Sequence, residues 1–284
     1  MAVLPVIEAP RYRPPVLDID PALAAEWLVA FLRDEMTVRR GIRDGVIGLS
    51  GGVDSAVVAF LAVRALGADH VHCIRMPYRT SSRDSLDDAQ AVIDALGCRS
   101  QTIEITAAVD GYLQLEPDAD PRRRGNVMAR TRMLVLFDQS SKWNALPIGT
   151  GNKTERLLGY FTWHADDSPP VNPIGDLFKT QVWQLARHLG VPARIVDKAP
   201  SADLEANQTD EGDLGITYAL ADRILDLILS GRSDEQIVAR GFAPSDVGLV
   251  RRRIEGTHWK RHLPTTAMLS NTAINEFYLR PVDY

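Results

Sequence analysis

The chain has 284 residues, 45% of them hydrophobic and 24% charged, with a formal net charge of -5. This composition is typical of a globular protein that buries a substantial core. The acidic balance argues against a general nucleic-acid or membrane-surface binder, because such proteins carry a basic excess.

The cysteine content and hydropathy place the chain among cytoplasmic enzymes. Cys73 and Cys98 are the only cysteines, so a disulfide framework is not indicated. We also find no apolar run of membrane-spanning length. We therefore expect a cytoplasmic protein without nucleic-acid or membrane partners.

The N-terminal residues 1–19 carry four prolines and no clear period, so we expect an extended arm, followed by a single domain over residues 20–284. Asp20-Pro21 is a good helix start, an N-cap followed by proline at the first helical position. The helix is expected to run to about residue 39, with a set of apolar residues on one face: Leu23, Trp27, Leu28, Phe31 and Leu32.

The central part of the chain alternates predicted strands and helices. Strands are predicted from Gly45, over 71–76, over 101–105 and over 145–149. Helices are predicted from 54 to 66, and over 85–96, 126–143 and 178–189, with glycines after several of them. This alternation predicts the α/β class, a doubly wound, mainly parallel sheet with helices on both faces.

The remaining predictions concern loops and the C-terminal part. The long helix over 126–143 is expected to bury Met128, Leu134, Val135 and Phe137. We expect a mobile loop over residues 166–173 and an irregular polar segment over residues 199–215. Helices follow over 216–229, 234–239 and 244–254, and the tail from residue 257 has no strong period.

The stretch after the first strand, Ser50-Gly51-Gly52 leading into a helix, suits an anion. Backbone N–H groups at a helix start point outward, the helix dipole adds positive charge, and glycines let a phosphate approach. Ser50 and Ser55 add hydroxyl donors. A carboxylate in such a cradle repels its guest unless it holds a divalent cation, so Asp54 is interpreted as a Mg²⁺ ligand. The alternative is a glycine turn with an ordinary aspartate cap.

The six residues from Ser50 to Ser55 resemble the pyrophosphate loop of the ATP pyrophosphatase superfamily, whose members cleave ATP to AMP and pyrophosphate while adenylating an acceptor. The loop lacks the Gly-Lys-Ser/Thr ending of a Walker A loop. Across residues 48–263 the chain resembles the NAD synthetases, which amidate deamido-NAD. The resembling pieces are 50–55, 76–78, 125–126, 129–130, 132–133, 149–155, 159–162, 176–181, 200–204 and 210–211.

This resemblance implies an adenine nucleotide alpha hydrolase-like fold and an ATP site. Asp54 and Glu155 correspond to Mg²⁺ ligands, and Asp54, Lys179 and Asp166 to catalytic residues. Without the family pattern, Glu155 and Lys179 would be interpreted as surface residues. The implied ATP-binding residues are Gly48, Leu49, Ser50, Gly51, Gly52, Val53, Asp54, Ser55, Thr150, Lys179 and Ser201.

The resemblance also implies an acceptor site. Arg130 corresponds to a position that contacts deamido-NAD, with Asn126 one turn earlier on the same helix face, and Asp166 lies near the ammonia site. Three positions depart from the family pattern. Trp163 stands where the family has a lysine, Pro170 where it has an aspartate, and Trp259, beside Lys260, where it has a histidine. Trp163 and Trp259 either sandwich an aromatic ring of the ligand or serve as buried packing.

The function implied is that of a C–N ligase, an ammonia-dependent NAD synthetase that adenylates the acceptor carboxylate with ATP and Mg²⁺. Amidation of nicotinate mononucleotide, another adenylating amidotransferase or thiolase, and a non-catalytic nucleotide-binding protein are the alternatives. Only 45 residues precede the first core strand, so free ammonia is the expected donor unless a separate glutaminase subunit supplies it. Members of the family commonly form homodimers, and the aromatic residues of the first helix are candidates for that contact.

Overall fold

The computed structural model describes residues 17–201, 209–262, 265–267 and 269. Its centre is a four-stranded sheet of order β3-β2-β1-β4 in which every neighbouring pair is parallel. The strands are β1 (Asp44–Gly48), β2 (Val71–Arg75), β3 (Arg99–Thr102) and β4 (Ala145–Pro147). The predicted parallel sheet is therefore confirmed, and the predicted arm over 1–19 lies mostly outside the described residues.

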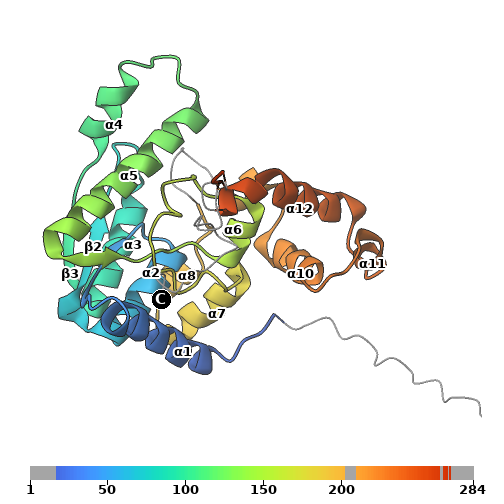
Figure 1. The fold of residues 1–284 in the computed structure, drawn as a ribbon, viewed down its shortest axis with the longest axis horizontal. Coiled ribbons are helices and arrows are strands. Elements are labelled where there is room, and N and C mark those ends of the chain that lie inside the picture. Colours follow the sequence, from blue (N-terminus) through green and yellow to red (C-terminus); the bar gives the residue numbers. More distant parts are fainter. Residues whose placement is uncertain (1–16, 202–208, 263–264, 268, 270–284) are drawn as a thin grey trace, which may run out of the picture.

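The helices that connect and follow these strands fall close to their predicted positions (Figure 1). In chain order they are α1 (Pro21–Arg33), the π-helix η1 (Asp34–Val38), α2 (Val53–Leu66), η2 (Ala68–His70), α3 (Arg83–Leu96), α4 (Thr106–Leu113), α5 (Pro121–Trp143), α6 (Lys153–Leu158), α7 (Lys179–Leu189), α8 (Ala193–Val196), α9 (Asp210–Leu214), α10 (Tyr218–Leu229), α11 (Asp234–Val238), α12 (Pro244–Thr257) and η3 (His258–Arg261). Within the described part of the chain, no helix has the length and apolar character that crossing a membrane requires.

Successive side chains of the central strands enter different layers. Ile47 and Cys73 pack into the core shared with α1, α2, α3 and α7, whereas their neighbours Val46 and Ile74 pack with Leu136 of α5. Side chains of a strand point alternately to opposite faces, so burying both faces needs apolar residues at consecutive positions. Helices therefore cover both faces of the sheet, as the doubly wound prediction requires.

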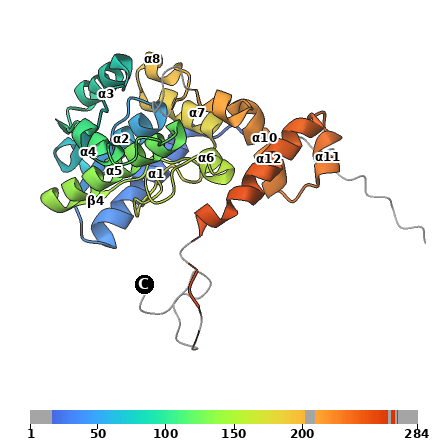
Figure 2. The ribbon, with the colours of Figure 1, turned by 90° about the horizontal axis from the view of Figure 1, so that it is seen from above.

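The C-terminal helices pack around a second core. Buried residues of α6, α10, α11 and α12 form it, among them Leu158, Ile224 and Val250. Figure 2 shows α10, α11 and α12 projecting to one side of the sheet layer. Trp183 of α7 packs against both cores, so α7 joins the two parts. The single domain over 20–284 stays a prediction.

The first helix begins as predicted but buries only part of its expected face. Asp20 accepts hydrogen bonds from the Ala22 and Leu23 N–H groups, which makes it the N-cap. Leu32 is fully buried, but Trp27 is 71% exposed and Leu23 and Phe31 are also exposed. The helix then changes to π geometry over η1, which ends near the predicted boundary.

The structure corrects several details of the sequence prediction. Leu134, expected to be buried, is 63% exposed, and Leu136 takes its place in the core. The third strand covers Arg99–Thr102 and therefore begins and ends before the predicted 101–105 segment. Ile103 and Ile105, beyond its end, pack into the core. Helix α4 was not predicted, and α9 lies within the segment 199–215 that was expected to be irregular.

The two cysteines lie side by side in the core beside β2. Cys73 and Cys98 are free, buried thiols whose Sγ atoms are 3.6 Å apart. Their side chains therefore contribute to the packing of the sheet core.

Candidate active site

The loop between β1 and α2 has the geometry of an anion cradle. Gly52 is the N-cap of α2 and, being a glycine, offers no side-chain acceptor to the first N–H groups of the helix. The Ser50 and Ser55 hydroxyls lie 3.0 Å apart, and the Gly52 N–H donates to Ser50 Oγ. Free N–H groups and a helix dipole at one place favour a phosphate.

Gly51 is required by the tight approach of this loop to α3. Its φ of +83° lies in a region that side chains disfavour, and a Cβ would lie 2.2 Å from the Ser85 carbonyl oxygen. Ser85 itself is held by the N-cap Ser82, whose hydroxyl accepts from the Ser85 N–H. The glycine therefore allows the loop to rest directly on α3.

The central interaction of the site joins the loop to two later segments of the chain. Lys179 Nζ lies 2.5 Å from Asp54 Oδ2 and 3.0 Å from Glu155 Oε1. The Lys179 side chain is only 2% exposed, and the two carboxylates are largely buried. The structure thus brings together Asp54, Glu155 and Lys179, the three residues to which the family resemblance assigned metal and phosphate roles.

Burial and charge oppose each other in this cluster. Burial alone lowers the pKa of Lys179, but the carboxylates of Asp54 and Glu155 outweigh it and leave that pKa raised. Burial raises the pKa of Glu155 to about 7, although the Lys179 ammonium works against the rise. One buried cation therefore faces two carboxyl groups, an arrangement that favours a further cation.

Asn152 holds the two carboxylates in place, and the sequence analysis did not identify this role. Its Nδ2 donates to Asp54 Oδ1 at 2.9 Å, and its Oδ1 accepts from the Glu155 N–H at 2.9 Å as the N-cap of α6. Its side chain is fully buried. The Asn-x-x-Glu spacing is a capping-box signal that the sequence contained.

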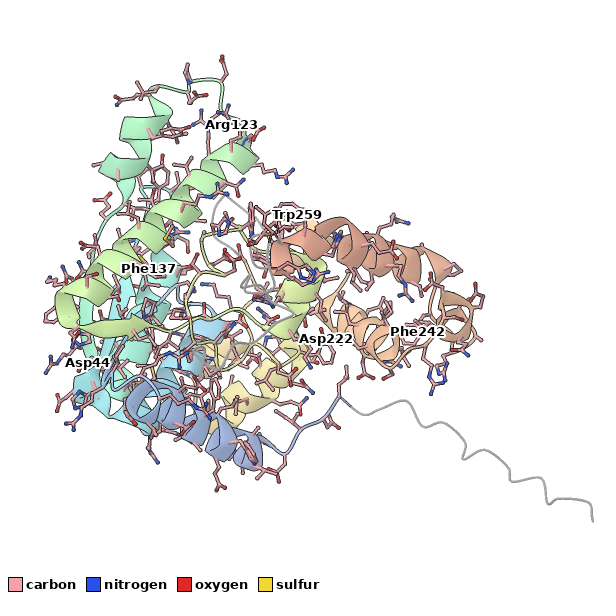
Figure 3. The ribbon with its side chains drawn as sticks, in the orientation of Figure 1. Asp44, Arg123, Phe137, Asp222, Phe242 and Trp259 are labelled. Atoms are coloured by element: carbon pink, nitrogen blue, oxygen red, sulfur yellow. The ribbon has the colours of Figure 1, made fainter. Side chains whose placement is uncertain are left out.

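A buried carboxylate also fixes the backbone at Lys179. Asp222 of α10 accepts from the Thr154 hydroxyl at 2.5 Å and from the Thr180 N–H and hydroxyl at 2.9 and 2.8 Å (Figure 3). The Thr154 hydroxyl in turn accepts from the Lys179 N–H. Asp222 appears in the sequence only as a charge on a helix, which explains why its position did not predict a role.

Thr150 and Ser201, two further predicted ATP-binding residues, lie on the segments that follow β4 and α8. Thr150 follows β4 and is half-buried, and Ser201 is exposed at the end of a described segment. The chain before Ser201 is anchored near the phosphate loop, because Lys198 Nζ lies 2.9 Å from Asp88 Oδ2 and 3.3 Å from Ser85 Oγ.

The predicted acceptor residues gather around the segment after α6. Arg130 of α5 donates to the Trp163 carbonyl oxygen at 3.1 Å, and the Thr162 hydroxyl donates to Asn126 Oδ1 at 3.1 Å. Lys260 of η3 donates to the Gly159 and Phe161 carbonyl oxygens at 2.8 and 2.6 Å. Burial lowers the pKa of Lys260.

The two tryptophans of this cluster contact each other. The Trp163 and Trp259 rings are 5.2 Å apart and nearly perpendicular, at 85°. Trp259, labelled in Figure 3, lies at the end of the C-terminal helices that faces α5. Perpendicular rings at contact distance leave no parallel slot between them. In this arrangement the rings pack on each other and present one aromatic surface.

Asp166 adjoins the same segment. Its Oδ1 accepts from the Thr162 N–H at 2.8 Å. The residue is exposed as a whole, and desolvation of its carboxyl group raises the pKa of Asp166 to about 6. Pro170 is exposed in the following loop, and Val171 forms a parallel bridge with Ile148.

Asp54 and Glu155 offer carboxylate oxygens, which are the ligands that Mg²⁺ prefers. Within residues 17–201, 209–262, 265–267 and 269, no group of three or more His, Cys, Asp or Glu side chains is arranged to hold a metal. Asp54 and Glu155 nevertheless converge on one cation, the Lys179 ammonium. Mg²⁺ typically takes one or two carboxylates together with substrate phosphates and waters, so this pair suits the ion when a nucleotide is bound.

Comparison with known proteins identifies relatives along nearly the whole chain. A family model described as NAD synthase matches residues 24–264. The NH(3)-dependent NAD(+) synthetase of Chlorobaculum parvum is 49% identical over 259 residues, which cover 91% of this chain and 93% of that protein.

Two solved structures are similar in fold as well as in sequence. An NMN synthetase from Francisella tularensis has a TM-score of 0.79 at 33% identity and covers 88% of this chain and 99% of that one. An NH3-dependent NAD synthetase from Campylobacter jejuni, in complex with nitrate, has a TM-score of 0.77 at 29% identity and covers 88% of this chain and 100% of that one. The expected adenine nucleotide alpha hydrolase-like fold is therefore confirmed.

Proposed function

Because the chain belongs to the NAD synthase family, we propose that it is an ammonia-dependent NAD synthetase. It amidates the nicotinate carboxylate of deamido-NAD with ammonia and converts ATP to AMP and pyrophosphate. The observation that carries the proposal is the buried Lys179 ammonium, which lies between two carboxylates beside the phosphate loop. A protein that only binds a nucleotide does not need this charged set.

The reaction proceeds in two steps. A carboxylate oxygen of the acceptor attacks the α-phosphorus of ATP, so that pyrophosphate leaves and an acyl adenylate forms. Ammonia then attacks the acyl carbon, AMP leaves, and a proton of the attacking nitrogen is lost. Positioning and charge stabilisation supply most of the rate, because no side-chain nucleophile is needed.

The chain's own residues divide these tasks. The 48–55 loop, with Thr150 and Ser201, binds the ATP phosphates through N–H and hydroxyl donors. Lys179 turns its ammonium toward the negative charge that develops on the phosphates. Asp54 and Glu155 would hold Mg²⁺, which when bound neutralises phosphate charge.

The acceptor binds at the cluster of α5, the segment after α6 and η3. The guanidinium of Arg130 binds a phosphate or ribose edge, and Asn126, Trp163, Trp259 and Lys260 line the same place. Asp166 holds ammonium and accepts its proton. Support for this subsite is the convergence of these residues on one segment of backbone.

Nicotinate mononucleotide is a second candidate acceptor. The similar Francisella tularensis protein is described as an NMN synthetase. Here Trp163 and Trp259 stand where the family pattern has a lysine and a histidine, and Pro170 stands where it has an aspartate. An acceptor surface with fewer polar side chains suits a ligand with fewer polar groups, and nicotinate mononucleotide has fewer than deamido-NAD.

The proposal is tested by mass spectrometry of the products formed from ATP, Mg²⁺ and ammonium with either acceptor. Deamido-NAD should give NAD, with AMP and pyrophosphate in equal amounts. Product from nicotinate mononucleotide alone transfers the proposal to that acceptor, and no amide from either contradicts it. The Asp54→Asn variant should lose pyrophosphate release, because an amide is a poorer Mg²⁺ ligand.

A homodimer and a cytoplasmic location are part of the proposal. Trp27 and Phe31 on the exposed side of α1 are available for a contact between subunits. Free ammonia is the proposed nitrogen donor, and replacing ammonium by glutamine in the same assay should give no amide unless a separate glutaminase subunit is added.

A further inference from the structure

Asp210, the first residue of α9, contacts three segments that carry proposed functions. Its Oδ2 accepts from the Tyr218 hydroxyl at 3.0 Å, and its Oδ1 accepts from the Tyr160 hydroxyl at 3.1 Å. Its N–H donates to the Pro200 carbonyl oxygen at 2.9 Å, next to Ser201. The residue is only 5% exposed. A buried residue that binds three segments, two through its carboxylate and one through its N–H, fixes their relative positions.

The Tyr218 contact leads to the catalytic lysine. Lys179 Nζ lies 5.0 Å from the centroid of the Tyr218 ring, in a cation–π arrangement. Tyr218 is fully buried, and its N–H donates to Glu211 Oε1 at 2.8 Å. The ring therefore forms a rigid support under the ammonium, and Asp210 holds the far end of that ring.

The Tyr160 contact leads to the acceptor cluster. Tyr160 lies between Gly159 and Phe161, whose carbonyl oxygens accept from Lys260. Three residues further on, the Trp163 carbonyl oxygen accepts from Arg130. Fixing the Tyr160 hydroxyl therefore limits the positions open to this backbone segment.

We propose that Asp210 is a positioning residue that aligns Lys179 with the acceptor segment, so that phosphate charge and the acceptor carboxylate meet in the productive geometry. The inference rests on the proposed function. It assigns two separable effects: Tyr218 transmits the position of Asp210 to Lys179, and Tyr160 transmits it to the acceptor segment. The network reaches the phosphate loop through Lys179, whose ammonium pairs with Asp54.

The hydrogen-bonding pattern indicates which substitution preserves the role. The Tyr160 hydroxyl carries one proton, and it lies 3.1 Å from Asp210 and 2.8 Å from Asp213 Oδ2. One proton cannot make two full hydrogen bonds. An asparagine at position 210 can accept from Tyr218 and donate to the Tyr160 oxygen, so that every group is satisfied.

The experiment measures kcat and both KM values for wild type, Asp210→Ala, Asp210→Asn, Tyr218→Phe and Tyr160→Phe. For Asp210→Ala we expect a fall in kcat of about 10- to 100-fold, in the range that small misplacements of reacting groups cause. The KM for the acceptor should rise more than the KM for ATP. Asp210→Asn should restore most of the activity.

The two phenylalanine variants separate the effects and keep the buried rings. Tyr218→Phe should lower kcat with little change in the acceptor KM, and Tyr160→Phe should raise the acceptor KM with a smaller change in kcat. Asp213→Asn is the matched control on the same helix, because Asp213 contacts Tyr160 but not Tyr218. Its kcat should equal that of wild type.

Several outcomes overturn the inference. They are a wild-type kcat in Asp210→Ala, an equal loss in Asp213→Asn and Asp210→Ala, or a rise in the ATP KM as the main effect. Urea unfolding of each variant identifies loss of fold, and Tyr160→Phe and Tyr218→Phe still decide the question if Asp210→Ala unfolds. A wild-type protein that makes no amide contradicts the proposed function instead, so the two failures are distinguishable.

Discussion

The ammonium nitrogen of Lys179 lies 2.5 Å from Oδ2 of Asp54, although 125 residues separate the two in the chain. Glu155 completes the cluster from a third segment, at the start of α6. The cluster of Asp54, Glu155 and Lys179 therefore joins the phosphate loop, α6 and α7 at a single point. We propose that its charges serve stability in the free protein and phosphate chemistry when ATP is bound.

Lys179→Met should expose the balance between these two tasks. Removing one partner of a buried ion pair typically costs about 3 to 5 kcal/mol, and we expect a loss of about that size in the free energy of unfolding, measured with urea at pH 7.5. We also expect kcat to fall at least about 100-fold, as when one stabilising donor is removed from an active site.

A double variant provides the control for Lys179→Met. Lys179→Met with Asp54→Asn removes a positive and a negative charge together, so it should be more stable than Lys179→Met alone. MgCl2 without nucleotide should raise the unfolding midpoint of Lys179→Met more than that of wild type, because the carboxylates are then open to an ion. A single variant as stable as wild type would show that the pair contributes nothing to folding.

Asn152→Ala should separate helix capping from the support of Asp54. Loss of an N-cap costs about 0.5 to 2 kcal/mol, and this variant should lose at least that much stability together with most of its activity, because Asn152 also holds Asp54 Oδ1. Ser233 caps α11 with a similar capping box, far from the site. Ser233→Ala should be destabilised similarly and keep full activity. Equal activity in the two variants would contradict the role of Asn152.

Trp163→Ala should affect the acceptor and not ATP. It removes the aromatic surface shared with Trp259, so the acceptor KM should rise about 5- to 160-fold if stacking contributes on the order of 1 to 3 kcal/mol. Trp143→Ala is the matched control, because that ring stacks on His72 at the far end of α5. It should lower stability and leave the acceptor KM unchanged. An unchanged KM in Trp163→Ala would place the acceptor elsewhere.

Because the pKa of Asp166 is raised, the free energy of unfolding should fall as the pH rises toward that pKa. Desolvation lifts the pKa of this carboxyl from 3.8 to about 6, so between these values the folded protein holds a proton that the unfolded chain has lost. The slope of unfolding free energy against pH is then negative, and the contribution is lost as the pH passes about 6. Asp166→Asn should therefore gain stability relative to wild type between pH 5 and pH 7.5. Urea unfolding at the two pH values measures this difference, and parallel changes in both proteins would contradict it.

The sequence predicted those parts of the fold that local patterns determine. Consecutive apolar residues such as Val46 and Ile47 indicated a strand buried on both faces, and Gly67 and Gly97 indicated helix ends. Leu134 was assigned to the wrong side of α5, because it lies about 200° around the helix from Leu136, which is buried on the same side as Met128. Helix α4 lacks a side-chain cap and carries a glycine in its interior, and both features hide a helix from pattern analysis.

The candidate site was predicted unevenly for a related reason. The resemblance to a family indicated Asp54, Glu155 and Lys179, whose motifs are short and contiguous. Asp222 and Asp210 act through partners 40 or more residues away, such as Thr180 and Tyr160. No spacing in the sequence encodes such contacts, because they depend on how α10 and α9 pack against α7 and α6.

Helix α7 has a consequence for hydrogen exchange, because it belongs to both cores through Val182 and Trp183. Opening the sheet core alone leaves its inner turns covered by the C-terminal helices, and opening that second core leaves them covered by α1 and α2. Amide protons exchange at the rate set by the cheapest opening that exposes them. Those in the middle of α7 should therefore exchange only when the whole molecule unfolds, which places the helix that begins at Lys179 among the slowest-exchanging parts of the described chain.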